Sequence, residues 1–296
     1  MRDEAIFNKS TQNTPEAYKR AIRELTHLYL RLRLLDKAKD EFISIASHEL
    51  RNPMAIIKGN ISMILAGDAG AISPEVKDIL TDVIVAVERQ IRLVNELLDV
   101  SRIEAGIMYF NLKEVNVIQL SQLLANSLKG VVKMKEVTIE VVDPKDPLPA
   151  VQADQDKISQ VLINLVTNAI KFTNGGSIKI SFHKNGGFIV TSVTDTGEGI
   201  PAEQKEFLFK KFSKPAASNV GTISSGSGLG LYISKKYIEK LGGDIWLEKS
   251  TPKLGSTFCF SLPIAGSAKA SEVADDFKSV QSIKNARESL KGGPYG

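Results

Sequence analysis

The strongest case for chemistry in this sequence is a histidine followed by an acid and, one helical turn later, by an amide. These residues are His48, Glu49 and Asn52, within the segment 42–53. On a helix of about 3.6 residues per turn, His48 lies almost opposite an apolar face made by Phe42, Ala46, Leu50 and Ile57. A histidine held outside the core beside a carboxylate can act as a nucleophile. An ordinary surface helix explains the same residues without any chemistry, so this segment alone does not distinguish a reactive histidine from a surface one.

Two amides and a lysine mark a second candidate site, on the helix predicted for residues 154–172. Asn164, Asn168 and Lys171 follow one another at i, i+4 and i+7, in a narrow band beside the core-facing stripe of that helix. An amide oxygen is a hard, neutral ligand for Mg²⁺, and a lysine supplies positive charge to phosphate oxygens. The band therefore favours a polyphosphate site, with a solvated helix face as the alternative.

Two glycine-containing segments lie downstream. Asp195, Gly197 and Gly199 follow a predicted strand. The carboxylate there can accept a hydrogen bond from an exocyclic amine, and the glycines allow a close backbone approach. The second segment leads into a helix, where free N–H groups and the helix dipole favour anions. It contains Gly226, Gly228, Leu229 and Gly230. It is neither a Rossmann turn, because no strand precedes it, nor a Walker loop, because no Gly-Lys-Ser/Thr occurs.

The chain between these segments, residues 201–225, is expected to form a mobile lid over a bound nucleotide. It carries two aromatic rings and three lysines before a stretch rich in Ser, Gly and Asn: Phe209, Phe212, Lys210, Lys211 and Lys214. A plain surface loop is the alternative.

Long helices must position the histidine. Residues 14–46 are predicted to be helical, starting at Thr14-Pro15-Glu16. The three-four spacing of Leu25, Leu28, Leu32, Leu35 and Phe42 indicates a short coiled-coil seam with a partner helix. An amphipathic helix packed on its own chain is the alternative.

An antiparallel helical hairpin is predicted next. Pro53 is expected to bend or weaken the helix after the histidine, and a second helical run reaches about Leu65. Glycines at 67–70 break the helix, and Ser73 caps another that ends near Gly106. One hairpin buries too little apolar surface to be stable, whereas two make a four-helix bundle, so we expect a homodimer.

A mixed, mostly antiparallel sheet with helices on one face, an α/β two-layer sandwich, is predicted after Gly106. The expected strands are 108–112, 137–142, 177–183, 187–194, 244–249 and 256–262, and the expected helices are 117–133, 154–172 and 229–241. Asn185-Gly186-Gly187 predicts a hairpin turn. Residues 264–296 contain only a weak helical pattern and are expected to be a mobile tail or a docking helix.

Composition narrows the function classes. The 296 residues include 43% hydrophobic and 24% charged residues, as in ordinary globular proteins, and a net charge of +4 gives no case for nucleic acid. The single cysteine, Cys259, excludes an internal disulfide and is expected to be an inert core thiol. No apolar stretch approaches the roughly 20 residues of a membrane span. We expect a soluble, cytoplasmic protein or the cytoplasmic portion of a membrane sensor.

Four motifs in fixed order resemble those of the sensor histidine kinases of two-component signalling. Residues 48–53 match the phosphoacceptor box, 164–173 the asparagine box, and 195–199 and 226–231 the two glycine boxes. Residues 97–106 resemble the usual end of the dimerization hairpin. The phenylalanine box is looser, because Phe209 and Phe212 lack the acid and proline often found between them. The resemblance covers roughly residues 38–263.

The resemblance implies a dimerization and phosphotransfer hairpin (38–106), a linker (107–116) and an ATP-binding catalytic domain of the Bergerat, or GHKL, fold (117–263). The two ends, which it does not cover, are expected to be an entry or coiled-coil helix (1–37) and a tail (264–296). The resemblance also implies roles. His48 would accept phosphate from ATP with Glu49 as base, and Asn52 would support dephosphorylation of a response regulator. Asn168 would hold Mg²⁺, and Asn164 and Lys171 would contact phosphates. Asp195 would bind the adenine amine. The remaining nucleotide contacts would come from Gly197, Gly199, Lys214, Gly226, Gly228, Leu229, Gly230 and Thr257.

Three rival functions share this ATP fold. Gyrase-type and chaperone ATPases carry a glutamate four residues before the metal-binding asparagine, where this chain has Asn164. An anti-sigma serine kinase would lack the histidine hairpin. A catalytically dead scaffold would not need the intact boxes. The signal sensed, the response regulator, and whether one subunit phosphorylates itself or its mate are not encoded in recognisable residues.

Overall fold

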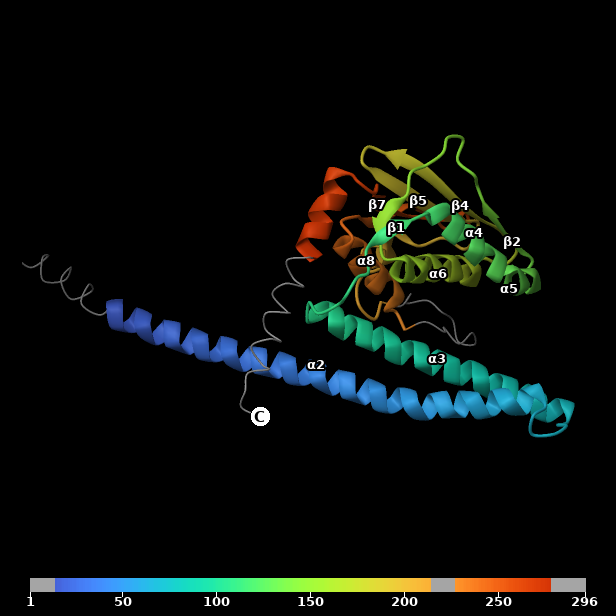
Figure 1. The fold of residues 1–296 in the computed structure, drawn as a ribbon, viewed down its shortest axis with the longest axis horizontal. Coiled ribbons are helices and arrows are strands. Elements are labelled where there is room, and N and C mark those ends of the chain that lie inside the picture. Colours follow the sequence, from blue (N-terminus) through green and yellow to red (C-terminus); the bar gives the residue numbers. More distant parts are fainter. Residues whose placement is uncertain (1–13, 214–226, 278–296) are drawn as a thin grey trace, which may run out of the picture. The chain divides into compact units, whose positions relative to one another are not determined.

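The computed structural model describes residues 14–213 and 227–277 (Figure 1). The chain divides into two units, Met1–Met108 and Tyr109–Gly296. Each unit is described by itself. Within the described residues, no helix is long and apolar enough to cross a membrane.

The first unit is an antiparallel pair of helices, α2 (Thr14–Ala66) and α3 (Pro74–Glu104). The predicted start of α3 is confirmed, because the side chain of Ser73 accepts a hydrogen bond from the backbone of Val76 at 3.4 Å. Pro53, where the helix is expected to bend or weaken, lies inside α2, and the two helical runs predicted on either side of it form one helix. A proline removes a single amide donor, and the turns on either side of this 53-residue helix remain bonded.

Polar and apolar contacts hold α2 on α3. Arg51 Nη2 donates to Asn95 Oδ1 at 2.5 Å, and Lys58 Nζ lies 2.7 Å from Glu88 Oε1. Ile61, Val94 and Leu98 are buried, yet Phe42 is 71% exposed and Ile79 62% exposed. A single hairpin therefore leaves much of its apolar surface in water, which is costly at roughly 25 cal/mol per Å².

The second unit contains a five-stranded sheet in the order β2-β4-β5-β7-β6. Only β2 and β4 are parallel, and the other neighbours are antiparallel, which confirms the predicted mixed sheet. The predicted turn is also confirmed, because Asn185 pairs with Phe188 across two glycines. The strands are β2 (Val137–Val141), β4 (Gly176–Asn185), β5 (Phe188–Asp195), β6 (Ile245–Thr251) and β7 (Gly255–Pro263).

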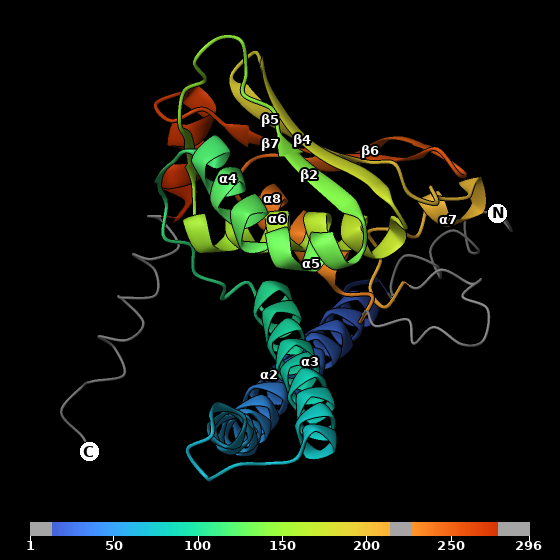
Figure 2. The same ribbon diagram turned by 90° about the vertical axis from the view of Figure 1, so that its right-hand side faces the viewer.

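Helices cover one face of this sheet (Figure 2). They are α4 (Val117–Ser127), α5 (Lys129–Met134), α6 (Gln155–Phe172) and α8 (Gly230–Lys240), while α7 (Ala202–Lys205) is a single turn. The core between the layers is made of fully buried aliphatic and aromatic side chains, among them Ile158, Leu162, Ile178, Ile180, Tyr237 and Phe260. The sheet and helix α6 thus form the rigid frame behind the candidate nucleotide site.

The prediction from the sequence places one small sheet wrongly. The strand expected at 108–112 is wrong, because the structure has β1 (Lys113–Val115) instead, paired with β3 (Val151–Ala153), which was not predicted. Three-residue strands are too short to display an alternating pattern. The expected helix 117–133 is divided at Leu128 into α4 and α5.

The beginning of the C-terminal segment is ordered against the second unit. Residues 268–277 form a helix that buries Ala270 and Val273. Gly242 makes room for it, since a Cβ there would lie 2.5 Å from Val273 Cγ2. The Phe277 ring lies 5.2 Å from the Phe110 ring. Of the two alternatives expected for this segment, residues 268–277 thus form the docking helix and not the mobile tail, and 278–296 lie outside the described part of the chain.

Candidate nucleotide-binding site and phosphoacceptor helix

Asp195 is a buried carboxylate at the end of β5, with 7% of its surface exposed. Its Oδ1 accepts hydrogen bonds from the backbone N–H groups of Gly197 (2.9 Å) and Ser256 (3.2 Å). Burial raises the pKa of Asp195, and these two bonds partly oppose that increase. Because both bonds end on Oδ1, Oδ2 is left to accept from a ligand amine.

The turn after Asp195 is packed against backbone on two sides. A Cβ at Gly197 would lie 2.3 Å from the Phe172 carbonyl oxygen, and one at Gly199 would lie 2.1 Å from the Thr251 carbonyl oxygen. Gly199 also has φ +67°, which favours glycine. These contacts fix the loop between the end of α6 and the β6–β7 hairpin, so the carboxylate of Asp195 is rigidly presented.

Replacing Gly199 by alanine is expected to destabilise the protein by about 3 kcal/mol, because positive φ and overpacking each cost one to a few kcal/mol. Urea denaturation of the second unit measures the effect. Gly187→Ala is the control, since no atom lies within 4 Å of its Cβ position and its φ is not positive. Equal midpoints for the two variants would contradict the close packing of this loop.

Two serines that lie beside Asp195 are not among the site residues predicted from the sequence. Ser256 donates its N–H to Asp195, and its hydroxyl lies 2.9 Å from that of Ser250. Ser250 Oγ in turn accepts from the N–H of Ile200 at 2.8 Å. The sequence signal that could have identified Ser256 is the alternation of β7, in which neighbouring residues face opposite sides of the sheet.

The same alternation places Thr257, the β7 residue that was expected to contact the nucleotide, relative to Asp195. Its hydroxyl lies 3.1 Å from that of Thr194, the residue before Asp195. Successive residues of β5 point to opposite faces, so Thr257 lies on the face away from the Asp195 carboxylate. Ser256, not Thr257, is the β7 residue beside that group.

The two predicted amides of α6 are brought together with the glycine segment. Asn168 Nδ2 donates to Asn164 Oδ1 at 3.4 Å, and Asn164 Nδ2 donates to Ser234 Oγ of α8 at 3.0 Å. A Cβ at Gly230 would lie 2.3 Å from Asn164 Oδ1, so glycine is needed there. In this arrangement the Oδ1 atom of Asn168 is free to face a cation. The third residue of the predicted band, Lys171, has its Nζ 4.9 Å from the centre of the Phe172 ring.

The glycine segment begins α8 and is fixed by local contacts. Leu229 is 1% exposed, and its N–H donates to Ser227 Oγ at 3.0 Å. Gly228 has φ +73°, and a Cβ there would lie 2.8 Å from the Ser213 carbonyl oxygen. Of the predicted contacts, Lys214 and Gly226 lie outside the described residues.

The start of the expected lid is anchored to the sheet. The Phe209 ring lies 6.4 Å from that of Phe258 in an edge-on arrangement, whereas Phe212 is 61% exposed. Lysines lie over nearby rings, with Lys211 Nζ 5.2 Å from the Tyr232 ring. The described lid residues thus combine a packed end with exposed aromatic surface.

The candidate phosphoacceptor residues lie on α2. Glu49 and Asn52 are exposed, and the intervening Arg51 is tied to α3 through Asn95. His48 belongs to the same helix, although its side chain is outside the described part of the structure. The Arg51 contact fixes the rotation of α2 on α3 at this point, and with it the direction in which Glu49 and Asn52 face.

Within residues 14–213 and 227–277, no group of three or more His, Cys, Asp or Glu side chains could hold a metal ion. The described candidate for a cation is therefore the amide oxygen of Asn168. Its chemistry fits Mg²⁺, which commonly takes few protein ligands and completes its shell with phosphate oxygens and water.

Two family models match this chain. Residues 38–106 match the His Kinase A (phospho-acceptor) domain. Residues 153–266 match the histidine kinase-, DNA gyrase B- and HSP90-like ATPase domain. These ranges contain the α2–α3 hairpin around His48 and nearly all of the nucleotide site described above.

Similar proteins combine the same two parts. The chain is 34% identical over 248 residues to hybrid signal transduction histidine kinase D of Dictyostelium discoideum, covering 81% of this chain and 16% of that protein. It is 32% identical to the circadian input-output histidine kinase CikA of Synechococcus elongatus, covering 76% and 30%. The structure of full-length ShkA in complex with AMPPNP aligns with TM-score 0.63 and 26% identity, over 77% of this chain and 46% of ShkA.

The chain thus spans less than a third of the length of these two relatives. The matched ranges nevertheless include both the phosphoacceptor hairpin and the ATP-binding domain, in the order predicted from the motifs. The chain belongs to the sensor histidine kinases of two-component signalling.

Proposed function

We propose that this chain binds ATP, transfers the γ-phosphoryl group to His48 and passes it on to an aspartate of a response-regulator receiver domain. The observation that carries the proposal is the pairing of a phosphoacceptor hairpin with a built nucleotide site in one chain. In that site Asp195 is held by two backbone N–H groups, and the α6 amides face the glycine segment. The structure of full-length ShkA in complex with AMPPNP, which aligns with this chain at TM-score 0.63, supports the proposal that a nucleotide is bound here.

Each nucleotide contact follows from chemistry at a described atom. Asp195 Oδ2 accepts from the adenine amine, and the N–H groups at the start of α8 receive phosphate oxygens. Asn164 and Lys171 contact phosphates. Asn168 Oδ1 would hold Mg²⁺, which would neutralise part of the phosphate charge. Gly197, Gly199, Gly228, Leu229 and Gly230 shape the site. Lys214 and Gly226, which lie outside the described residues, are further expected contacts.

His48 attacks the γ-phosphorus through a neutral ring nitrogen. Free imidazole has a pKa of about 6.5 and is mostly neutral near pH 7. Glu49 orients the ring and accepts its remaining proton. Phosphoryl transfer depends mainly on in-line placement and charge stabilisation, so the ATP-binding unit must reach the hairpin, and helix movement can permit or prevent that approach.

A homodimer is part of this proposal. The apolar side chains left exposed on the hairpin, such as Phe42 and Ile79, are the surface that a second copy would bury in a four-helix bundle. The seam of Leu25, Leu28, Leu32 and Leu35, all exposed in the single chain, would continue the bundle as a coiled coil. Sedimentation equilibrium measures the molar mass in solution, which is expected to be that of two chains.

The leading alternative is an ATPase that releases phosphate to water. Those enzymes need a base where this chain has Asn164, and a side-chain amide cannot take a proton from water near neutral pH. Incubation with ATP labelled at the γ-phosphate separates the two functions. A kinase gives an acid-labile, base-stable label on the protein, whereas an ATPase gives free phosphate without protein label.

We also propose that the chain dephosphorylates its response regulator, with Asn52 placing the attacking water. Asn52 is exposed on α2, four residues after His48. Asn52→Ala is expected to slow the loss of phosphate from a phosphorylated cognate receiver domain at least 10-fold while leaving autophosphorylation intact. Asn60→Ala, another exposed amide of α2, is the matched control. An unchanged rate with Asn52→Ala would remove this role.

A further inference from the structure

Strand β2 is the end strand of the five-stranded sheet, and within the described residues no strand pairs with its outer side. The Glu136 carbonyl accepts from Gly176 N at 3.3 Å, and Val142 N donates to Ile180 O at 2.9 Å, so residues 136 and 142 turn their backbone groups toward β4. Because these directions alternate along a strand, Val137, Ile139 and Val141 direct their N–H and C=O groups outward. The edge therefore offers hydrogen bonds to an added strand.

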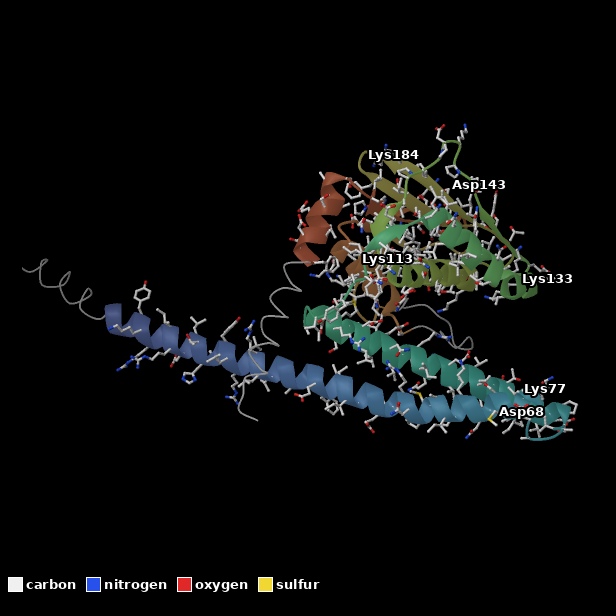
Figure 3. The ribbon with its side chains drawn as sticks, in the orientation of Figure 1. Asp68, Lys77, Lys113, Lys133, Asp143 and Lys184 are labelled. Atoms are coloured by element: carbon white, nitrogen blue, oxygen red, sulfur yellow. The ribbon has the colours of Figure 1, made fainter. Side chains whose placement is uncertain are left out.

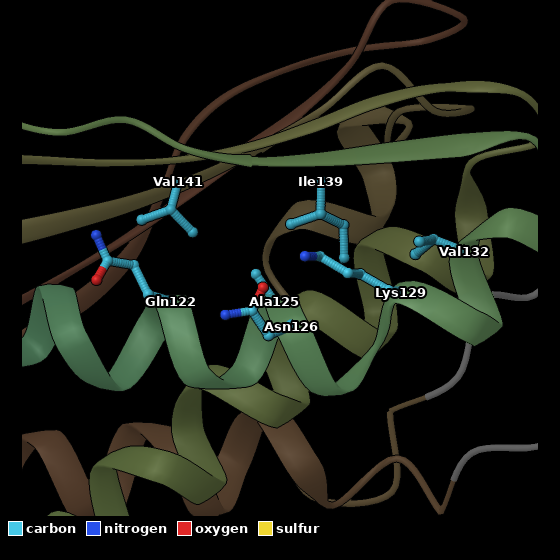
Figure 4. Close-up of a pocket in the computed structure, with 7 residues that line it drawn as sticks. All are labelled: Gln122, Ala125, Asn126, Lys129, Val132, Ile139 and Val141. Carbon is cyan, nitrogen blue, oxygen red and sulfur yellow. The ribbon is translucent and has the colours of Figure 1, made fainter.

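A pocket of about 300 Å³ adjoins this edge. Figure 4 shows Gln122, Asn126 and Lys129 rising from α4 and α5 toward β2, while Ile139 and Val141 point back at them. Ile139 and Val141 are half-buried, so α4 does not cover them completely. The same two residues thus supply outward backbone groups and an apolar pocket wall.

The polar rim of the pocket is positively charged at one end. Lys129 is exposed, and the described residues give its ammonium group neither an ion pair nor a hydrogen bond. Gln122 Nε2 donates to Asp143 Oδ1 at 3.1 Å, which places a carboxylate at the other end. An aliphatic wall below a free ammonium group suits a side chain with an apolar stem and an acidic tip.

We propose that the β2 edge and this pocket bind an extended segment of a partner protein as an added strand, with an acidic side chain of that segment reaching Lys129. In such recognition, backbone hydrogen bonds supply affinity and a pocket for alternate side chains supplies specificity. Val137, Ile139 and Val141 set the register, and the pocket selects the residue that faces it. This inference does not depend on the kinase activity.

A library of phage-displayed random nonapeptides, selected on the full chain, tests the proposal. Enriched sequences are expected to alternate β-branched residues and to contain Glu or Asp, and the strongest peptide is then measured by fluorescence polarisation. Lys129→Glu is expected to weaken that peptide at least 10-fold and to restore binding of its Glu/Asp→Lys derivative. Lys133→Glu, on the same short helix but outside the pocket lining (Figure 3), is expected to change affinity less than 2-fold.

Amide hydrogen exchange followed by NMR tests the geometry directly. In the free protein the amides of Ile139 and Val141 are expected to exchange faster than those of Thr138 and Glu140, and the selected peptide is expected to protect them. Failure to enrich any peptide, equal binding by both lysine variants, or protection elsewhere would overturn the proposal. If β2 is protected in the absence of peptide, and more strongly at higher protein concentration, two copies of the chain pair through this edge. That result would also overturn the proposal. ATP binding, measured alongside, reports on the nucleotide site separately.

Discussion

The His48→Gln protein is expected to bind ATP with unchanged affinity and to acquire no acid-labile phosphoryl label. Glutamine retains hydrogen-bonding capacity but lacks the nucleophilic ring nitrogen, so the rate of label incorporation should fall at least 1,000-fold, to background. The proposed nucleotide contacts lie in the other unit of the chain, around Asp195 and α6, and are expected to be untouched by the change. Filter-binding of the protein after incubation with γ-labelled ATP measures the label, and fluorescent-nucleotide titration measures the affinity.

His27→Gln is the matched control, because His27 is an exposed histidine of the same helix outside the phosphoacceptor motif. It should label at the wild-type rate. Undiminished labelling of His48→Gln, or equal loss in both variants, would mean that His48 is not the acceptor.

Asp195→Asn is expected to lower ATP affinity about 100-fold. The N–H groups of Gly197 and Ser256 require an acceptor at the Oδ1 position, so the asparagine amide would keep its oxygen there and turn its NH₂ group toward the adenine amine. A donor would then face a donor, which costs about 2–3 kcal/mol in the lost charge-assisted bond. The conservative change leaves the packing of the loop in place, and the thermal midpoint should not fall.

The pH dependence follows from the direction of the pKa shift. Burial raises the pKa of Asp195, so above that pKa the charged carboxylate lowers the free energy of unfolding. This destabilisation is lost as pH falls and the group is protonated. The proposed adenine contact needs the charged carboxylate, so wild-type ATP affinity is expected to decrease as pH falls through the raised pKa of Asp195, at a higher pH than for an ordinary aspartate. Asp195→Asn should lose this pH dependence. Asp146→Asn, at an exposed carboxyl, should retain it, and identical pH profiles would contradict the assignment.

The elements with long or strong local signals were predictable. The cap at Ser73, the two-residue turn between β4 and β5, and the long helices follow from capping, turn chemistry and periodicity. The β1–β3 pair was not predictable, since its strands have three residues each and are paired by long-range contacts. The order of the large sheet, with β7 inserted between β5 and β6, depends on packing that no local pattern encodes.

The candidate site was predictable where one element carries several of its residues. Asn164 and Asn168 share a face of α6, and helical spacing alone brought them together. One hydrogen-bond partner of Asp195, Ser256, comes from β7, about 60 positions later in the chain. The choice between Ser256 and Thr257 depends on which face of the strand each occupies. Knowledge of the strand register was therefore needed to choose the correct neighbour.

The contact between the Phe110 and Phe277 rings has a consequence for the reach of the catalytic unit. Phe110 also lies edge-on to the buried ring of Tyr237 at 6.1 Å, and the N–H of Asn111 donates to Asp154, the cap of α6, at 2.7 Å. The chain is thus fastened from Phe110 onward, and α3 ends at Glu104. Residues 105–107 donate backbone hydrogen bonds to the last turns of α3, so only Met108 and Tyr109 lie between the two fixed stretches. Loss of the Phe277 ring would loosen Phe110 and lengthen the link between the two units. The effective concentration of one unit near the other would then fall.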